Sequence, residues 1–173
     1  SFEGANETEF VPYKNGVVCA KMNHMSYIDG TGTVVWEIDT AIVDPILKVD
    51  GNYILIAEKG RNKICLYIDN KLQYDVDDPD TVMSAELSSN GDVVVVTDKS
   101  SYRGGISVYN KSGEQIFSWA SGSDAVICAD ISAASRSVAV ALLNSDVTAK
   151  TTVQLFNVNE TESYAKIEMP DTV

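Results

Sequence analysis

Short apolar stretches, each bounded by turn-forming residues, follow one another along the whole chain. An amphipathic helix would place apolar residues at i, i+3, i+4 and i+7, and no such stripe continues for three helical turns in this sequence. The apolar stretches are separated by Gly, Asn, Asp and Ser, and several of them alternate with polar residues. This pattern is typical of strands joined by tight turns, so the chain is predicted to be all-β.

One β-hairpin pattern occurs four times. Each copy is a strand, a turn rich in polar residues, and a second strand that ends in an aromatic residue; the copies occupy residues 26–36, 66–74, 108–119 and 155–164. The aromatic residue before each turn lies at position 27, 67, 109 and 156, which gives spacings of 40, 42 and 47 residues. A period of about 40–50 residues is typical of one four-stranded blade of a β-propeller.

Two further strands are predicted before each hairpin. An inner strand is expected at 10–13, 45–49, 83–87 and 126–131, and a more apolar central strand at 16–20, 53–57, 93–96 and 138–142. Continuous apolar strands suit a sheet that is covered on both faces, as a propeller blade is by its two neighbours. The turn before the strand at 93–96 contains Asn90-Gly91, which predicts a tight type I′ hairpin.

The repeats therefore predict an all-β fold, a β-propeller of four four-stranded antiparallel blades that is either complete or part of a larger ring. Residues 1–173 are expected to form this single domain, with blades at approximately 8–40, 41–80, 81–123 and 124–169. The apolar and aromatic residues that dominate each repeat are expected to form the core.

The chain is strongly acidic, with 25 Asp and Glu residues against 13 Lys and Arg residues and a net charge of −12. Nucleic-acid sites are built from clustered Lys and Arg, and anionic lipid surfaces repel acidic proteins. Neither partner is predicted, and solubility is the main role expected of the charge. No stretch approaches the ~18–20 apolar residues that a membrane-spanning helix requires.

Residues suited to catalysis are scarce in this sequence. His24 is the only histidine, so paired-histidine metal sites are impossible, and no serine-nucleophile motif is present. No catalytic residue and no cofactor are predicted. Cys19, Cys65 and Cys128 lie singly within apolar strands, where a free cysteine usually acts as a small buried apolar residue, and their odd number argues against a disulfide framework.

The acidic stretch at residues 75–80 is the one candidate for a metal site. Asp75, Asp77, Asp78 and Asp80 could coordinate Ca²⁺, because clustered carboxylates supply the oxygen ligands that this ion prefers. The spacing does not match an EF-hand, and no glycine provides its sharp bend. A solvated loop between blades, in which Pro79 ends the sheet, is the alternative interpretation.

Three sequence segments resemble a known family. They are Phe10–Val18, the turn Ser26–Gly32 and the motif Val49–Tyr53, and they are similar to segments of an uncharacterised family of propeller-repeat proteins from clostridia and related Firmicutes, which itself resembles the quinoprotein-like propellers. The resemblance covers nearly the whole chain and implies a propeller outside the cytoplasm that a preceding segment, absent from this chain, anchors in the membrane. It also implies further blades, because members are usually longer. No residues match the quinone sites of quinoproteins.

Two functions are consistent with this sequence. The first is a non-catalytic binding or scaffold module, which would bind a protein partner through the loops at 58–63 and 99–105 or would self-associate through exposed blade faces. The alternative is an enzyme, or a small-ligand or Ca²⁺-binding protein, with carboxylates such as Glu86 and Asp130 at the propeller channel. The scarcity of catalytic residues favours the first.

Overall fold

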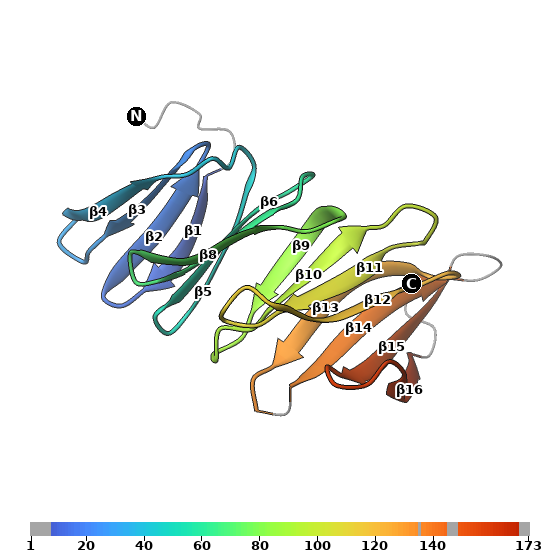
Figure 1. The fold of residues 1–173 in the computed structure, drawn as a ribbon. Coiled ribbons are helices and arrows are strands. Elements are labelled where there is room, and N and C mark those ends of the chain that lie inside the picture. The colour runs from blue at the N-terminus through green and yellow to red at the C-terminus, as the bar shows by residue number, and fades with distance from the viewer. Residues whose placement is uncertain (1–7, 135, 145–148, 170–173) are drawn as a thin grey trace.

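The computed structural model describes residues 8–134, 136–144 and 149–169, and every regular element within these residues is a β-strand. Four four-stranded antiparallel sheets follow one another along the chain (Figure 1). The prediction of four four-stranded antiparallel blades is confirmed. Within each sheet the strands lie in sequence order, so every strand pairs with the strand that follows it in the chain.

The four sheets are called blades 1 to 4. Blade 1 contains β1 (Glu9–Tyr13), β2 (Gly16–Lys21), β3 (His24–Ile28) and β4 (Val34–Asp39). Blade 2 contains β5 (Pro45–Asp50), β6 (Tyr53–Glu58), β7 (Lys63–Ile68) and β8 (Lys71–Asp77). Blade 3 contains β9 (Thr81–Leu87), β10 (Val93–Asp98), β11 (Gly105–Tyr109) and β12 (Gln115–Ala120). Blade 4 contains β13 (Ala125–Ser132), β14 (Ser137–Asn144), β15 (Lys150–Asn157) and β16 (Ser163–Met169).

Neighbouring blades pack face to face through three separate hydrophobic clusters. Met25 and Ile56 belong to the cluster between blades 1 and 2, and Leu66 and Val95 to the one between blades 2 and 3. Phe156 packs against Phe117 and Trp119 in the third cluster, between blades 3 and 4. The inner strands β1, β5, β9 and β13 of successive blades lie next to one another. The apolar residues of each repeat thus bury themselves against the next repeat rather than within one sheet.

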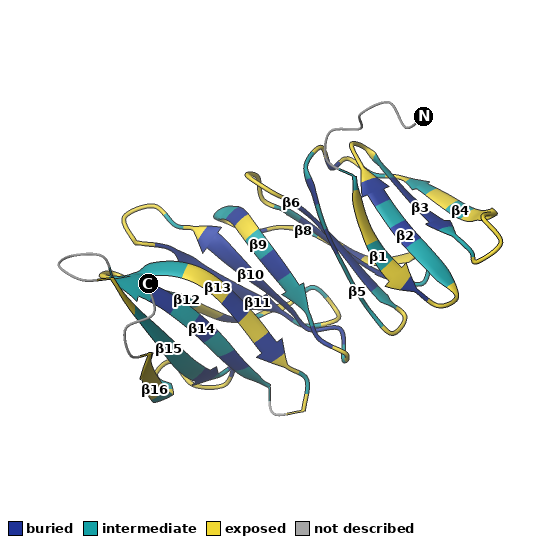
Figure 2. Cartoon of the chain, turned by 180° about the vertical axis from the view of Figure 1, so that it is seen from behind, coloured by how far each residue is buried: buried dark blue, intermediate teal, exposed yellow. Residues whose placement is uncertain are grey.

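The blades form a row with blade 1 at one end and blade 4 at the other (Figures 1 and 2). Within the described residues, each of these two blades therefore has a neighbouring blade on one face only. Figure 2 shows the effect on burial: β10 of the inner blade 3 is dark blue (buried) along most of its length, whereas much of β14 and β15 of blade 4 is teal (half-buried). The burial of a strand in this protein depends on its place in the row.

The hairpin at Asn90-Gly91 differs from the sequence-based prediction. A type I′ turn needs a positive φ at both central residues, and only Gly91 has one, at +83°. Leu87 pairs with Val93, so five residues form the loop, closed by a bond from the Gly91 N–H to the Ser88 carbonyl oxygen (3.0 Å). Glycine at this position makes room for a neighbour, because a Cβ atom at residue 91 would lie 2.6 Å from the Tyr53 ring of blade 2.

A polar contact joins blades 1 and 2 at the turns Lys14-Asn15 and Asp69-Asn70. Lys14 Nζ donates a hydrogen bond to Asp69 Oδ1 at 2.7 Å, and the Tyr13 hydroxyl donates to the same oxygen. Lys14 and Asp69 both have positive φ, at +50° and +53°, a conformation that non-glycine residues adopt only when their surroundings stabilise it. The side-chain bond between the two turns provides such stabilisation.

Candidate binding cleft

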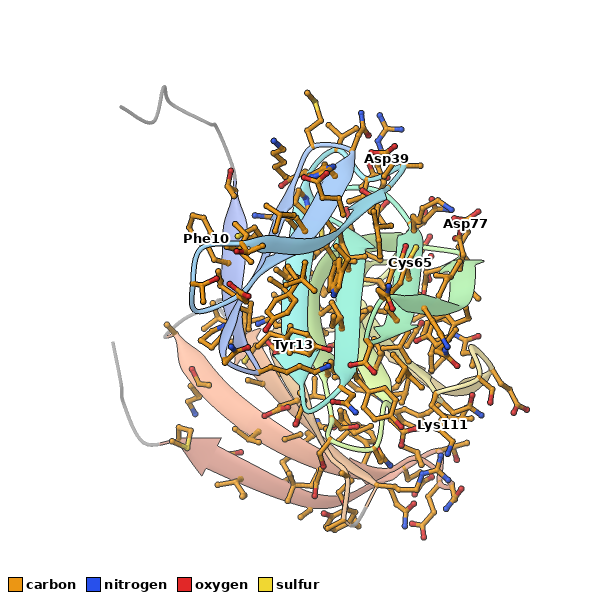
Figure 3. The ribbon with its side chains drawn as sticks, turned by 90° about the vertical axis from the view of Figure 1, so that its left-hand side faces the viewer. Phe10, Tyr13, Asp39, Cys65, Asp77 and Lys111 are labelled. Atoms are coloured by element: carbon orange, nitrogen blue, oxygen red, sulfur yellow. The ribbon has the colours of Figure 1, made fainter. Side chains whose placement is uncertain are left out.

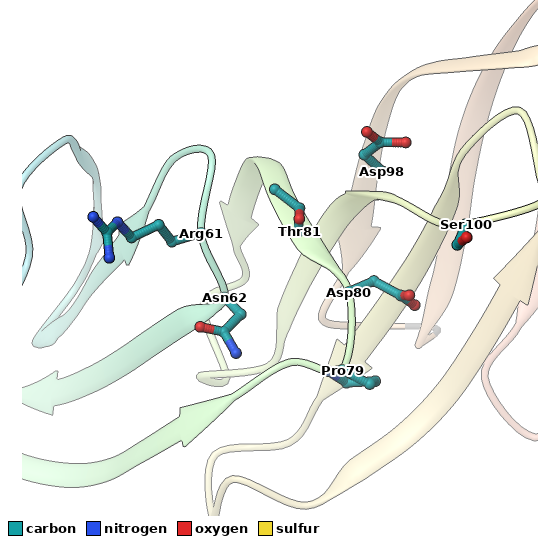
Figure 4. A pocket seen from close by; sticks show the side chains of 7 residues that line it. All are labelled: Arg61, Asn62, Pro79, Asp80, Thr81, Asp98 and Ser100. Carbon is teal, nitrogen blue, oxygen red and sulfur yellow. The ribbon is translucent and has the colours of Figure 1, made fainter.

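A cleft of about 420 Å³ opens between blades 2 and 3, in the middle of the row, where connecting loops of the two blades lie. It is lined by three segments that are distant in sequence: the β6–β7 hairpin, the β8–β9 connection and the β10–β11 hairpin. Its lining residues are Arg61, Asn62, Pro79, Asp80, Thr81, Asp98 and Ser100 (Figure 4). The loops at 58–63 and 99–105, which were predicted to bind a partner, thus meet each other and the acidic stretch at one site.

Backbone hydrogen bonds hold the walls of this cleft in fixed positions. The Gly60 N–H donates to the Val82 carbonyl oxygen at 2.8 Å, and the Val82 N–H donates to the Arg61 carbonyl oxygen at 2.6 Å. Gly60 has a φ of +74°, which a glycine adopts without steric cost. The hairpin tip of blade 2 is therefore tied to the first strand of blade 3, and the cleft exists before any partner binds.

Asp78 lies beneath the cleft as a structural carboxylate. It is only 1% exposed; its Oδ1 accepts a bond from the Asp80 N–H at 2.8 Å, and its Oδ2 accepts one from the Tyr109 hydroxyl at 2.7 Å. Burial, together with this hydrogen bond, raises the pKa of Tyr109, so its hydroxyl remains a donor. These bonds compensate the cost of burying the carboxylate and fix the β8–β9 connection against blade 3.

The ionised groups around the cleft differ in how they are paired. Asp80 Oδ2 lies 3.1 Å from Nζ of Lys99, which follows Asp98 in the sequence. Arg61 extends away from Asp80 and Asp98 (Figure 4), and its Nε lies 3.5 Å from the buried Glu58 carboxylate. Asp98 is exposed at the end of β10. The surface offers a carboxylate and a guanidinium at separate positions, which suits contacts with a polar partner more than the binding of a single ion.

A second cleft of about 330 Å³ adjoins the first and shares Asp98 with it. Its lining includes Arg103 together with Met83 of β9 and Ile127 of β13, two apolar side chains that are nearly half exposed. The two clefts together are called the Asp98 surface. Exposed apolar residues next to charged ones are typical of surfaces that bind proteins.

The four aspartates that are candidate cation ligands have different partners in the structure, apart from Asp75 and Asp77, which share Lys63. Lys63 Nζ lies 2.6 Å from Asp75 Oδ1 and 3.8 Å from Asp77 Oδ1, Asp78 is buried against Tyr109, and Asp80 pairs with Lys99. Among the residues that the structure describes, no three His, Cys, Asp or Glu side chains are placed to hold a metal ion. Asp78 therefore acts at the joint between blades 2 and 3, whereas Asp75 and Asp77 pair with Lys63 within blade 2.

The two channel carboxylates, by contrast, line one hollow. Glu86 and Asp130 border a space of about 350 Å³ with Cys128 and with apolar residues of blade 4. Glu86 Oε1 accepts a hydrogen bond from Lys48 Nζ at 2.7 Å, which neutralises its charge. Asp130 is exposed and accepts a bond from the N–H of its own neighbour, Ile131.

The three cysteines, all free, lie in different environments. Cys65 is buried, and burial raises the pKa of its thiol to about 12. Cys19 is half-buried on β2, and burial raises its pKa as well. Cys128 is exposed, so the prediction that all three are buried is wrong for this residue. It faces the side of blade 4 that no other blade in the described residues covers.

His24 lies on β3 next to two carboxylates of β4. Its Nε2 is 3.6 Å from Glu37 Oε1, and its Nδ1 is 3.5 Å from Asp39 Oδ1. No serine or cysteine nucleophile hydrogen-bonds to it among the contacts of the described residues. The arrangement is a cross-strand polar contact on blade 1, and none of its residues lines the Asp98 surface.

Sequence reasoning missed Asp98, Thr81, Met83 and Ile127 as members of the site. Each lies at or near the end of a strand that was predicted for its apolar core, so these residues were counted as packing or overlooked. Asp98 could have been identified from the sequence, because it is the first acidic residue after the apolar run of β10 and marks the end of that strand. Their meeting depends on the juxtaposition of blades 2, 3 and 4, which the pattern within one repeat does not specify.

The arrangement of successive four-stranded antiparallel blades around neighbouring inner strands is that of a β-propeller protein. The chain belongs to DUF5711, a family of unknown function whose sequence profile matches residues 1–168. The resemblance found in the sequence is thereby confirmed at the level of a propeller family of unknown function. No sequence among the curated proteins matches this chain.

Three solved propeller structures illustrate the likeness. BamB from Moraxella catarrhalis is 15% identical and aligns over 92% of this chain and 47% of its own, with a TM-score of 0.65. KlAtg21, in a complex with the coiled coil of AgAtg16, is 14% identical and aligns over 89% of this chain and 52% of its own, with a TM-score of 0.64. The dihydro-heme d1 dehydrogenase NirN, in complex with DHE, is 12% identical and aligns over 95% of this chain and 37% of its own, with a TM-score of 0.68. At these identities the likeness concerns the fold alone.

This chain spans about half the length of BamB and of KlAtg21, and less of NirN. A membrane-spanning helix would have to be long and apolar, and the described part of the chain contains no such helix.

Proposed function

We propose that this chain is a non-catalytic binding module that binds a protein partner on the Asp98 surface. The observation that carries the proposal is the convergence of three loops from blades 2 and 3 on one preformed cleft, beside the exposed apolar residues Met83 and Ile127. A rigid sheet framework that presents several loops at one end is a common way to build a binding site. The complex of KlAtg21 with a coiled coil supports a protein partner by analogy of fold.

We further propose that the module works outside the cytoplasm, as part of a bacterial protein anchored in the membrane by a segment outside this chain. The support is the family resemblance of the three sequence segments described above. An accessibility experiment in a bacterium that encodes this family tests it, because an externally added protease would digest the propeller in intact cells only if the propeller lies outside the cytoplasm.

Selection of peptide ligands tests the binding role directly. A displayed library of random peptides would be selected on the native chain, and the affinities of the enriched peptides would be measured for the native chain, Asp98→Arg and Met83→Asp. Both residues are exposed, so the fold should tolerate the changes. We expect a loss of affinity of at least about tenfold for each, because charge reversal and removal of an apolar contact act at the centre of the surface.

Lys111→Asp is the matched control, since Lys111 is exposed in the hairpin turn between β11 and β12 and lies outside the Asp98 surface. It changes the charge by the same two units as Asp98→Arg does, with the opposite sign. Failure to enrich any peptide, or enriched peptides that bind all variants equally, would overturn the proposal.

One observation favours a second function. Glu86 and Asp130 line the same hollow at the inner edge of blade 4, as an enzyme or small-ligand protein with channel carboxylates would require. The ion pair of Glu86 with Lys48 makes a catalytic acid less suitable there. A screen of small cationic compounds would identify a ligand of this hollow. Its affinity should fall for the Asp130→Asn variant and stay unchanged for the Asp98→Arg variant, and this result distinguishes the two functions.

A further inference from the structure

The outer edge of each blade is a strand that pairs with one neighbour only. These edge strands are β4, β8, β12 and β16, and among the residues that the structure describes no further strand pairs with any of them. The unpaired N–H and C=O groups of an edge can bind the extended backbone of another chain, and proteins usually prevent this with charged residues or proline. The four edges can therefore be compared by how they are protected.

The edge strand β12 has neither form of protection. It reads Gln-Ile-Phe-Ser-Trp-Ala, without a charged residue or a proline. β12 belongs to blade 3, which packs against a neighbouring blade on each face, so its edge does not lie at an end of the row. Each of the other three edge strands contains at least two charged residues: Glu37 and Asp39 in β4, Lys71, Asp75 and Asp77 in β8, and Lys166 and Glu168 in β16.

The hydrogen-bond pattern shows which backbone groups of β12 remain unpaired. Just beyond the strand, the Ser121 N–H donates to the Gly104 carbonyl oxygen at 3.0 Å. The backbone groups of an antiparallel strand point alternately to its two sides, so those of Trp119 also point toward β11. The N–H and C=O groups of Ser118 and Ala120 therefore point toward the free edge. Ser118 is exposed and Ala120 is half-buried.

The corresponding positions of blade 2 carry charges. The Asp78 N–H donates to the Asn62 carbonyl oxygen at 2.8 Å, so the same alternation directs the backbone groups of Asp75 and Asp77 toward the free edge of β8. Figure 3 shows Asp77 at the outer rim of the molecule. Charged residues at these positions hinder pairing with a further strand, whereas the serine and alanine of β12 permit it.

The side chains of β12 indicate what an added strand would carry. Phe117 and Trp119 share one face, where their ring centroids lie 5.7 and 5.0 Å from that of Phe156. Trp119 is half-buried, so an apolar side chain on a neighbouring strand can extend this cluster. Ser118 and Ala120, on the other face, are small. A strand with apolar residues at every second position and uncharged residues between them fits both faces.

The charge of the molecule favours a foreign segment over a second copy of this chain. The chain has a net charge of −12, and the exposed Glu114 directly precedes β12. Two copies with this charge repel each other, whereas a segment with basic residues at its ends is attracted. The segment that suits this edge is therefore uncharged in its centre and basic at its ends.

We propose that β12 binds such an extended segment of a partner protein, which becomes a fifth strand of blade 3. In pairing of this kind, main-chain hydrogen bonds provide affinity and alternate side chains provide specificity. β12 contains no residue that lines the Asp98 surface, so the edge is a second binding site, separate from the one proposed above.

A peptide selection on the native chain tests this site. The displayed library contains peptides of about ten residues, with lysine at both ends and random uncharged residues between them. We expect the enriched peptides to bind Ser118→Pro at least about tenfold more weakly, because proline removes an outward N–H and leaves the ladder to β11 intact. Ala120→Pro removes the other outward N–H and should have the same effect. Circular dichroism of each variant shows whether its sheets are intact.

Asp75→Pro is the matched control, because it removes the outward N–H at the corresponding position of β8. The enriched peptides should bind Asp75→Pro and Asp98→Arg as tightly as the native chain. Peptides that lose affinity for Asp98→Arg and not for Ser118→Pro or Ala120→Pro would overturn this inference and leave the proposed function standing. Failure of this library to yield any peptide would also overturn the inference.

Amide hydrogen exchange tests the pairing itself. In the free chain the Trp119 amide should exchange slowly and the Ser118 and Ala120 amides rapidly, because only the first is bonded to β11. An enriched peptide should slow exchange at Ser118 and Ala120 by at least about tenfold, and binding without this protection would contradict the proposal. Sedimentation equilibrium of the chain alone covers the other occupant, since a dimer that Ser118→Pro abolishes would overturn the choice of a basic segment as the partner.

Discussion

Blades 2 and 4 are built from the same repeat, yet their strands are buried to very different degrees. In β6 of blade 2 every residue from Ile54 to Glu58 is buried, whereas in β14 of blade 4 buried and half-buried residues alternate. Both strands are apolar along most of their length. The difference arises because blade 2 has neighbouring blades on both faces and blade 4 has one on a single face. An apolar central strand is therefore buried on both sides in blade 2 and on one side in blade 4.

The leucine before the hairpin aromatic allows the sharpest test of this comparison. Leu66 on β7 and Leu155 on β15 occupy equivalent positions in the repeat, and Leu66 is 0% exposed while Leu155 is half-buried. Leu66→Ala should lower the free energy of unfolding by about 2–5 kcal/mol, the usual cost of a core cavity. Leu155→Ala should cost about 1 kcal/mol or less, because water already reaches this face.

Urea denaturation followed by circular dichroism measures both changes. Equal losses of stability in the two variants would show that blade 4 is covered on both faces in the isolated chain, and the comparison between the middle and the end of the row would fail.

A buried hydrogen bond to a charge sharpens the comparison between the interior and the ends. Tyr109 donates to the buried Asp78 carboxylate between blades 2 and 3, whereas Tyr27 of blade 1 donates to the exposed side-chain amide oxygen of Asn15 at 2.5 Å. Tyr109→Phe should cost about 1–3 kcal/mol, because it leaves a buried carboxylate without one of its donors. Tyr27→Phe should cost about 0.5–1.5 kcal/mol, since water can replace the lost donor.

Thermal and urea unfolding of the two phenylalanine variants compare the same chemical change in two settings. A larger loss for Tyr27→Phe than for Tyr109→Phe would contradict the view that the joint between blades 2 and 3 is the more completely desolvated of the two.

The smallest expected effect concerns the contact that attaches blade 1 to blade 2. Hydrogen bonds from Lys14 and then Tyr13 lower the pKa of Asp69 below its ordinary value of 3.8. A carboxyl group whose pKa is lower in the folded state stabilises the fold above its unfolded pKa, and this contribution disappears as the pH falls through the folded pKa. The native chain should therefore be more stable than Asp69→Asn at neutral pH, and the difference should vanish under acid conditions below about pH 4.

Unfolding curves of the two chains across this pH range measure the effect, which is modest because Lys14 and Asp69 are both solvent-exposed. Asparagine also tolerates the positive φ at residue 69, so the substitution changes the charge and not the turn. Added salt should reduce the difference at neutral pH by screening. A difference that is independent of pH would mean that Asp69 acts through the turn rather than through its charge.

The sequence predicted the local elements well, since strands and hairpins depend on residues that are close together. The hairpin aromatics gave the correct number of blades, and the apolar runs at 53–57 and 93–96 lie within β6 and β10. The type I′ turn at Asn90-Gly91 was wrong because the loop has five residues, and the Asp92 N–H donates to the side-chain oxygens of Ser88 and Asn90 within it. Two candidate binding loops were identified from their turn residues, but Asp98, Met83 and Ile127 were not.

The sequence by itself determined the repeat, the strand order within each blade and the continuous apolar character of the central strands, since each follows from short-range periodicity and turn residues. The tertiary structure alone decided which faces of the blades are covered, that Cys65 is buried while Cys128 is exposed, and that three loops meet around Asp98. These properties depend on which blade lies beside which. Contacts between repeats are made by side chains about 40 residues apart or more, and the pattern within a repeat does not encode that distance.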